Sequence, residues 1–267
     1  MNKSNQKIPL RITETLPDKK ITMKKFAFSC DDIDESIPKP LPQSLNWFFL
    51  IAGRPASGKT SLLLNLICKR GKNYNKKFDR IFVFSPSLIT LKSDPFEDLP
   101  DDQKFQELDL EILEAVLEDI AGSGDKVLLI MDDVVNDMKK SMKLQTLLSK
   151  VLMNRRHLAG EGGSVSVIIT TQVYNKIPAP IRKTASHLVI FHTKNKKELE
   201  TIFDELVLIP KQEFYDILKF TFRKNHDFLY IDTNKEYNKM FHRNFNQLEF
   251  GTPKEDYGVS ATAGTGD

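Results

Sequence analysis

Residues Gly53–Thr60 read GRPASGKT. This stretch fills the pattern of a glycine, four variable residues, a second glycine, a lysine, and a serine or threonine. Gly53 and Gly58 can adopt backbone angles that are closed to other residues, so successive N–H groups can turn toward one anion. A helix that begins near Lys59 would add the positive end of its dipole. The pattern therefore predicts a phosphate-binding loop, or P-loop, for a nucleoside triphosphate.

Individual residues of this loop have expected roles. The Lys59 ammonium should reach the β- and γ-phosphates as a catalytic point charge, and the Thr60 hydroxyl should ligate Mg²⁺ beside them. We expect the nucleotide to contact the whole segment, which comprises Gly53, Arg54, Pro55, Ala56, Ser57, Gly58, Lys59, Thr60 and Ser61.

Apolar runs alternate with helical patterns around the loop. Runs rich in valine, isoleucine and phenylalanine predict buried strands at 46–52, 80–84, 126–131, 165–171 and 187–191, with an edge strand at 228–231. Helical spacing predicts helices at 59–69, 107–120, 142–158 and 196–206. We therefore expect an α/β fold with a mainly parallel sheet, right-handed crossovers and helices on both faces. The expected class is a P-loop NTPase of the RecA-like, additional-strand type.

The two ends of the chain differ from its middle. Residues 1–44 are first lysine-rich and then acidic and proline-rich, which indicates a mobile or peripheral arm. Residues 251–267 are small and polar, which is typical of a disordered tail. The expected P-loop domain spans 45–250.

Composition excludes several other classes of protein. The chain has 267 residues, a net charge of +3 and two cysteines, which is too few cysteines for a disulfide framework, and no Cys/His cluster suggests zinc. The first twenty residues contain no apolar leader, and the apolar run 47–52 is far too short to span a bilayer. We expect an intracellular protein without membrane insertion.

A second motif ends the third predicted strand. Residues 126–133 read KVLLIMDD, an apolar strand followed by two aspartates, which matches a Walker B motif. Asp132 is expected to hold Mg²⁺ beside Thr60. Asp133 is expected to orient and polarise the attacking water, although aspartate is one methylene shorter than the more common glutamate. The alternative for both residues is helix capping or turn polarity at a strand end.

A GTPase interpretation fails at this motif, because the residues three positions after Asp132 and Asp133 are Val135 and Asn136, and neither is glycine. Residues 195–198 read NKKE and resemble a guanine-reading motif, but the last residue is glutamate. We interpret that segment as a solvated charged face.

Four polar residues further along are candidate catalytic groups. Gln172 follows the fourth predicted strand, where its amide can contact the γ-phosphate and the water. Arg155, Arg156 and Arg182 are candidate arginine fingers, which neutralise charge on a transferred phosphoryl group. The alternatives are a surface glutamine, a helix C-terminal charge for Arg155 or Arg156, and a salt bridge for Arg182.

Together these motifs resemble the DNA-packaging ATPases of large double-stranded DNA viruses, virophages and polinton-like elements, within the FtsK–HerA superfamily. The resemblance rests on GRPASGKT, on LLIMDD, and above all on residues 154–182, NRRHLAGEGGSVSVIITTQVYNKIPAPIR, and it covers about 45–235. It implies an ATP- and Mg²⁺-dependent motor that forms a homo-oligomeric ring, often a hexamer, and pushes double-stranded DNA into a preformed capsid. The implied partners are capsid vertex or portal proteins, and the implied locations are the host cytoplasm, the viral factory and the virion.

Three questions stay open at this level. Lys139, Lys140 and Lys143 are candidate contacts to the DNA backbone or simply an exposed helix face. A P-loop nucleoside or nucleotide kinase is an alternative function, which would require an arginine-rich lid and an acceptor pocket. A non-motor, NTP-dependent assembly factor is another, and the sequence does not separate ATP from GTP.

Overall fold

The computed structural model describes residues 32–68, 73–87 and 95–249. Their strands form one nine-stranded sheet in the order β3-β2-β4-β5-β1-β6-β7-β8-β9. The strands are β1 Phe48–Ala52, β2 Arg80–Phe84, β3 Lys104–Phe105, β4 Lys126–Asp132, β5 Ser164–Thr171, β6 His187–Phe191, β7 Phe228–Asp232, β8 Phe241–Arg243 and β9 Asn246–Gln247. The helices are α1 Lys59–Ile67, α2 Leu110–Ile120, α3 Val135–Lys140, α4 Met142–Asn154, α5 Ala179–Arg182, α6 Lys196–Leu206 and α7 Lys211–Thr221.

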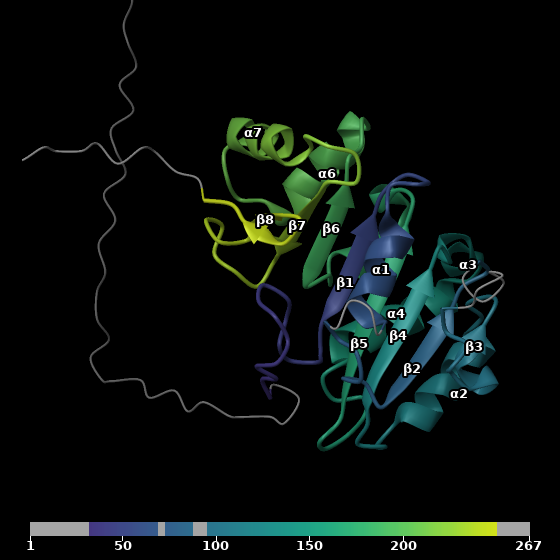
Figure 1. The fold of residues 1–267 in the computed structure, drawn as a ribbon. Coiled ribbons are helices and arrows are strands. Elements are labelled where there is room, and N and C mark those ends of the chain that lie inside the picture. Colours follow the sequence, from purple (N-terminus) through teal and green to yellow (C-terminus); the bar gives the residue numbers. More distant parts are fainter. Residues whose placement is uncertain (1–31, 69–72, 88–94, 250–267) are drawn as a thin grey trace, which may run out of the picture.

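The sheet is parallel from β3 to β6, and β7, β8 and β9 extend it in antiparallel fashion (Figure 1). β5 pairs with β1 on one side and with β4 on the other. An additional strand therefore separates the P-loop strand from the strand that carries the acidic pair, as the predicted fold class requires. The carboxyl ends of these parallel strands meet at one edge of the sheet, where the motifs of the sequence come together.

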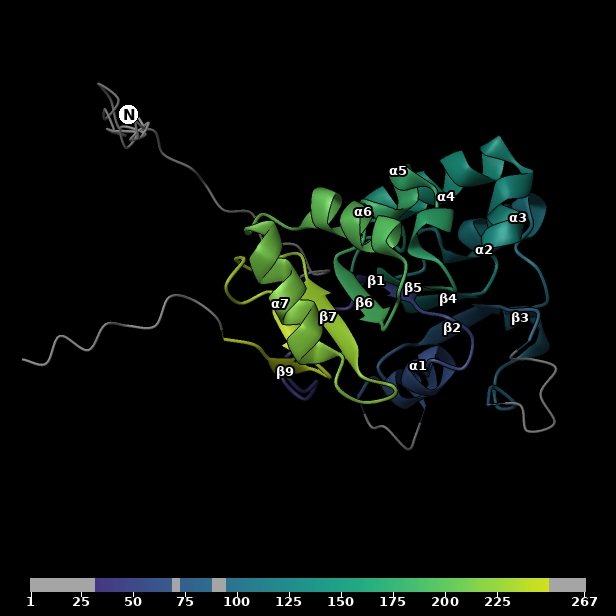
Figure 2. The same ribbon diagram turned by 90° about the horizontal axis from the view of Figure 1, so that it is seen from above.

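Both faces of the sheet are covered, because successive side chains of a strand point to opposite sides. On β1, Phe48 and Leu50 join one apolar core, and Phe49 and Ile51 join the other. The first core packs against α2, α4, α6 and α7, and the second packs against α1. Figure 2 shows α1 on one side of the sheet and α2 to α6 on the other. This confirms the predicted layers.

The proline-rich segment belongs to the folded body, contrary to our expectation for the part of the arm that the structure describes. Ile37 and Leu41 are 0% and 5% exposed and lie in the α1-side core. The hydroxyl of Tyr74 donates to the carbonyl of Pro42 (2.9 Å), and that of Tyr230 donates to the carbonyl of Pro40 (3.3 Å). The apolar side chains of Ile37 and Leu41, next to the prolines, anchor the segment, so the folded body begins before residue 45. Residues 1–31 and the expected tail lie outside the described residues.

The segment expected to be an edge strand is interior. β7 pairs with β6 on one side and with β8 on the other, because the 241–247 hairpin adds two short strands beyond it. The predicted helix over 107–120 begins at Leu110, because the Asp109 side chain caps it by accepting from the Glu111 N–H. The helix predicted over 142–158 ends at Asn154. α3, α5 and α7 were not predicted. Across the described ranges, none of the helices has the length and apolar character that crossing a bilayer requires.

Candidate functional site

The phosphate loop joins β1 to α1, and its backbone conformation and close packing require glycine at positions 53 and 58. Gly58 has a φ of +111°, a conformation that other residues rarely adopt. A Cβ on Gly53 would lie 2.7 Å from the Cβ of Phe191 on β6 and 2.6 Å from Ser57 Oγ. Phe191 therefore backs the loop and holds it close to the sheet. The sequence did not reveal this residue's role, since Phe191 reads as ordinary strand core.

The side chain of Lys59 folds over the phosphate loop and bonds to its backbone. Its Nζ donates hydrogen bonds to the carbonyls of Gly53 (2.7 Å) and Arg54 (3.3 Å). Burial lowers the pKa of Lys59, while the negative charges of Asp133 and Asp132 oppose that shift. The ammonium and both carboxylates thus lie close enough to interact electrostatically, so the phosphate loop and the end of β4 meet at one site.

Asp132, at the end of β4, is 4% exposed and has hydroxyl donors on both carboxylate oxygens. Thr170 Oγ1 donates to Oδ1 (2.6 Å), and Ser85 Oγ and Ser87 Oγ donate to Oδ2 (3.1 and 3.4 Å). Thr170 is the register partner of Asp132 on β5, and Ser85 follows β2. These three donors were not predicted from the sequence, although each stands at the carboxyl end of a strand next to β4.

Asp133 is the first residue beyond β4, and it adopts a left-handed backbone with φ of +56°. Its N–H donates to Thr170 Oγ1 (3.2 Å). Its Oδ2 accepts a hydrogen bond from Gln172 Nε2 (2.8 Å). The structure therefore brings together the two residues that the sequence nominated for handling water. The left-handed turn sends the two carboxylates of the pair in different directions, one into the hydroxyl cradle and one toward Gln172.

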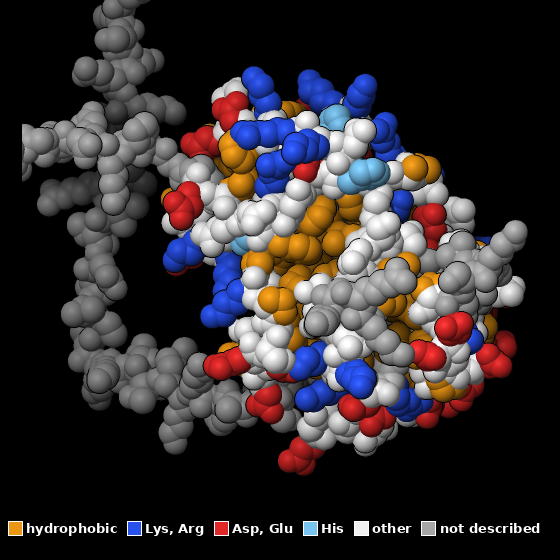
Figure 3. Space-filling model, in the orientation of Figure 1, with side chains coloured by type: hydrophobic (Ala, Val, Ile, Leu, Met, Phe, Trp, Pro, Cys, Tyr) orange, Lys and Arg blue, Asp and Glu red, His pale blue; other side chains and the backbone are white. Residues whose placement is uncertain are grey.

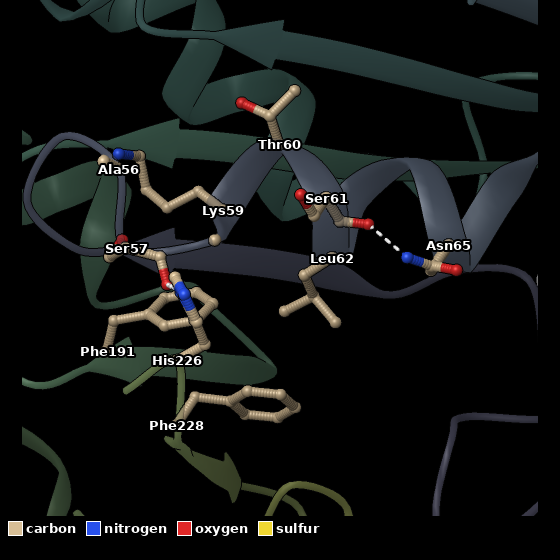
Figure 4. Close-up of a pocket in the computed structure, with 11 residues that line it drawn as sticks. Ala56, Ser57, Lys59, Thr60, Ser61, Leu62, Asn65, Phe191, His226 and Phe228 are labelled. Carbon is tan, nitrogen blue, oxygen red and sulfur yellow. Dashed lines mark hydrogen bonds between the residues drawn. The ribbon is translucent and has the colours of Figure 1, made fainter. Parts of the chain in front are cut away.

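A pocket of about 550 Å³ opens on the other side of the loop. Its walls are the loop itself, the start of α1, Phe191, and the beginning of β7; the lining comprises Ala56, Ser57, Gly58, Lys59, Thr60, Ser61, Leu62, Asn65, Phe191, His226 and Phe228. Lys59 and Thr60 point to one side of the loop, and the three rings lie on the other (Figure 4). A ring nitrogen of His226, Nδ1, lies 3.0 Å from the Ser57 carbonyl oxygen. His226 and Phe228 were not predicted as site residues.

The candidate arginine fingers do not gather at this site. Arg155 Nε donates to the Asn46 carbonyl (2.6 Å) and NH1 to the Leu152 carbonyl (2.5 Å). Asn46 lies at the amino end of β1, so Arg155 stands at the opposite edge of the sheet from the P-loop. Burial lowers the pKa of Arg155. Arg156, its neighbour, has an exposed side chain.

Arg182 forms a salt bridge within its own subunit, as the alternative interpretation held. Its Nε donates to Glu205 Oε2 (2.8 Å) and NH2 to Glu205 Oε1 (2.6 Å). NH1 donates to the Ile177 carbonyl (2.8 Å). Both side chains of the pair are largely buried, at 14% and 12% exposed. The hydrogen bonds that Arg182 donates to Glu205 raise the pKa of Arg182. Arg182 therefore links α5 to α6.

A magnesium ion fits the residues present. Mg²⁺ keeps several waters and takes one or two protein ligands beside phosphate oxygens, and Thr60 and Asp132 would supply those two. Within residues 32–68, 73–87 and 95–249 no group of three or more histidine, cysteine or acidic side chains is arranged to hold a metal unaided. A metal that binds together with a phosphate chain matches this donor set.

The strand order, the glycine loop and the acidic pair define a P-loop NTPase of the RecA-like, additional-strand type. The chain belongs to the Poxvirus A32 protein family, whose model matches residues 43–233. No sequence among the curated proteins matches this chain significantly.

Solved structures share the fold. The crystal structure of B204, the DNA-packaging ATPase from Sulfolobus Turreted Icosahedral Virus, superposes with a TM-score of 0.53 at 19% identity and covers 76% of this chain and 98% of that one. The genome packaging NTPase B204 from Sulfolobus turreted icosahedral virus 2 in complex with AMPPCP gives 0.50 at 18%, covering 74% and 96%. The pCW3 conjugation coupling protein TcpA with ATPgS gives 0.53 at 12%, covering 78% and 62%. The predicted resemblance to viral packaging ATPases is thereby confirmed for family and fold.

Proposed function

We propose that this chain is an ATP-hydrolysing motor subunit that moves double-stranded DNA into a preformed capsid. The observation that carries the proposal is the arrangement at the carboxyl edge of the sheet. A buried carboxylate, Asp132, faces the same environment as Lys59, and a second carboxylate, Asp133, is held by the amide of Gln172. The family and the fold shared with a DNA-packaging ATPase supply the biological setting.

The nucleotide would lie across the loop. Asp132 and Asp133 stand on the β4 side of β1, whereas the pocket of His226 and Phe228 opens toward β6 and β7. The γ-phosphate would therefore face the acidic pair, and the base would enter the pocket between α1 and the two rings. Aromatic walls suit a flat heterocycle. AMPPCP bound to a protein of the same fold supports an adenine nucleotide.

The chain's own groups have distinct tasks in this proposal. Lys59 would exchange its bonds to the loop carbonyls for the β- and γ-phosphates. Thr60 and Asp132 would hold Mg²⁺, which neutralises phosphate charge when bound. Asp133 would accept a proton from the attacking water, and Gln172 would fix the orientation of Asp133 and of the water.

Hydrolysis is favoured over phosphate transfer to a metabolite. The Asp133–Gln172 pair would offer an attacking water a carboxylate and an amide side by side. Release of inorganic phosphate without phosphorylation of added nucleosides or nucleoside monophosphates would support the ATPase, and a phosphorylated acceptor would support the kinase.

A homo-oligomeric ring, of hexameric type, completes the proposal. A finger that acts on a neighbour must be exposed, and of the three candidate arginines Arg156 best meets this condition. Mixing Arg156→Ala with wild-type subunits tests the role. Inhibition steeper than the mutant fraction indicates action in trans. Proposed partners are capsid vertex or portal proteins inside the infected cell.

The decisive experiment measures ATP hydrolysis against the concentration of double-stranded DNA, for the wild type and for Asp133→Asn. We expect turnover that DNA stimulates in the wild type and near-complete loss in the variant, with ATP binding retained. Equal turnover with and without DNA from a purified oligomer would contradict the motor and leave the non-motor assembly factor as the better interpretation.

A further inference from the structure

Two loops beside the nucleotide site each fold around a buried carboxylate. Glu198, in the first turn of α6 just after the β6–α6 connection, is 4% exposed. It accepts hydrogen bonds from the Tyr174 N–H (2.5 Å) and Thr193 Oγ1 (2.8 Å). Asp227, in the α7–β7 connection, is 5% exposed. It accepts from the N–H groups of Arg223 (3.1 Å) and Lys224 (2.8 Å), from Asn244 Nδ2 (2.7 Å) and from Arg243 NH2 (3.0 Å).

The buried acids leave the outer side of both loops positive. Residues 192–198 read HTKNKKE, and residues 223–227 read RKNHD, so each loop has one acid and it points inward. The exposed basic side chains of these loops are Lys194, Lys196, Lys197, Arg223 and Lys224, together with His192 and His226. Glu200, one turn into α6, lies 4.0 Å from Lys196.

The two loops lie side by side. The ring of His192 is 5.1 Å from that of Phe222, at the end of α7. His192, Lys224 and Arg54 of the phosphate loop line one hollow of about 160 Å³. Figure 3 shows Lys, Arg and His side chains gathered at the top of the molecule, over the carboxyl edge of the sheet. We call the surface formed by Lys194, Lys196, Lys197, Arg223 and Lys224 the basic ridge.

We infer that the basic ridge binds the phosphate backbone of double-stranded DNA. The inference rests on the proposed function and places the DNA contact on that subunit. Ammonium and guanidinium groups on rigid loops, without exposed acids between them, complement a polyanion whatever its base sequence. A motor that moves along any sequence needs backbone contacts of this kind. Because the basic ridge lies beside Arg54, DNA binding at the ridge would be coupled to the phosphate loop.

The lysines after the acidic pair are less suited to this role. Lys140 forms an ion pair with Asp137 (2.8 Å). The hydrogen bond that Lys140 donates to Asp137, with added negative charge from Glu107 and Asp109, raises the pKa of Lys140. Acidic groups therefore surround that helix face. Lys139, near the end of α3, and Lys143, at the start of α4, provide a control of the same residue type.

The test uses the triple variant Lys194→Gln/Lys196→Gln/Lys197→Gln. Its binding to a fluorescent duplex of about 30 base pairs is measured by anisotropy over a series of salt concentrations. We expect the Kd to rise about 10- to 100-fold at about 0.1 M salt and the salt slope to fall by about 2 to 3, because each lost phosphate contact removes about 0.9. Lys194→Arg/Lys196→Arg/Lys197→Arg should retain wild-type binding, and so should Lys139→Gln/Lys143→Gln.

Two failures are distinguishable. Wild-type protein that neither binds the duplex nor responds to it would contradict the proposed motor. Wild-type binding that the Lys194/Lys196/Lys197 triple variant leaves unchanged, or reduces no more than the control pair does, would overturn the basic ridge alone. A triple variant that loses affinity for ATP would also overturn it, because these lysines would then serve the nucleotide.

Discussion

The side-chain amide of Gln172 donates a hydrogen bond to Asp133 Oδ2 over 2.8 Å, and so joins the residue after β5 to the residue after β4. Adjacent parallel strands put their carboxyl ends side by side, and this bond is a direct consequence. The amide fixes which carboxylate oxygen faces the loop. The pair can therefore be tested as a unit as well as residue by residue.

Asp133→Asn should lower kcat about 10²- to 10⁴-fold, because an amide cannot take a proton from water. The affinity for ATP should stay near that of the wild type, since the loop residues that bind phosphates are unchanged. Steady-state phosphate release and fluorescent-nucleotide titration measure the two quantities. Asp204→Asn, on the exposed side of α6, is the control. Turnover retained in Asp133→Asn would remove this residue from the catalytic role.

Gln172→Ala should lower kcat about 10- to 100-fold with little effect on the KM for ATP, because the amide positions a group and does not transfer the proton. The double variant with Asp133→Asn should be barely slower than Asp133→Asn alone, since the two residues act together. Single-turnover hydrolysis is the measurement. Independent, multiplicative losses would show that Gln172 acts apart from Asp133.

Lys59→Ala should weaken ATP binding about 10- to 100-fold, which corresponds to the loss of charge-assisted hydrogen bonds. Burial lowers the pKa of Lys59, so its charge is lost at a lower pH than that of an ordinary lysine. ATP affinity should therefore fall on the alkaline side earlier than lysine titration alone predicts. Lys59→Arg should remove that alkaline fall even if its overall affinity is lower, which calorimetry at a series of pH values would show.

Arg182→Ala should destabilise the fold by about 2–4 kcal/mol, because it leaves the buried Glu205 carboxylate without its cationic partner and with only the Tyr174 hydroxyl, among the described residues, as a donor. Glu205→Gln should cost less, and a double-mutant cycle in urea should show strong coupling between the two sites. In mixtures with wild-type subunits, activity should fall in proportion to the fraction of Arg182→Ala. A steeper fall with unchanged stability would restore Arg182 as a trans finger.

His187 should make the protein sensitive to acid. Burial lowers its pKa from 6.5 to about 3, and the Tyr230 hydroxyl lies 3.0 Å from its Nδ1. Asp232 Oδ1, 3.6 Å from the same nitrogen, favours the charged ring, but burial outweighs it. Between these two values only the unfolded chain takes up the proton, so the free energy of unfolding falls by about 1.4 kcal/mol for each pH unit lost. His187→Phe should reduce this slope in urea titrations from pH 6 to 4 by about one proton, and His157→Asn should not.

The sequence predicted the fold class and the order of the main elements well, because strands buried on both sides are apolar throughout and P-loop motifs are local. The strands at 80–84 and 187–191 and the helix at 196–206 agree residue for residue with the structure. Contacts between distant segments could not be predicted. Ser85, Thr170 and His226 read as ordinary loop or strand residues until the strand order brings them beside Asp132 or the phosphate loop.

Two predicted features have contacts with distant segments that the sequence did not reveal. The proline-rich segment has the composition of an arm, yet Ile37 and Leu41 reach a core whose other walls lie far along the chain. Arg182 has the sequence position expected of an arginine finger, yet in the structure it donates a hydrogen bond to Glu205 of α6. The sequence identifies the chemical type of each side chain. Which residue that side chain contacts depends on tertiary packing.

The additional strand β5 has a consequence for distance. Neighbouring strands lie about 4.8 Å apart, so β1 and β4, separated by β5, stand about 10 Å apart at their carboxyl ends. Reacting atoms approach to about 3–3.5 Å before bonds change, so this width accommodates a phosphoryl group and an in-line water beyond the carboxyl end of β5, between the phosphate loop and the acidic pair. The distance between the phosphate loop and the acidic pair is thus set by main-chain pairing. A side-chain substitution at either strand end changes the chemistry there but not this distance.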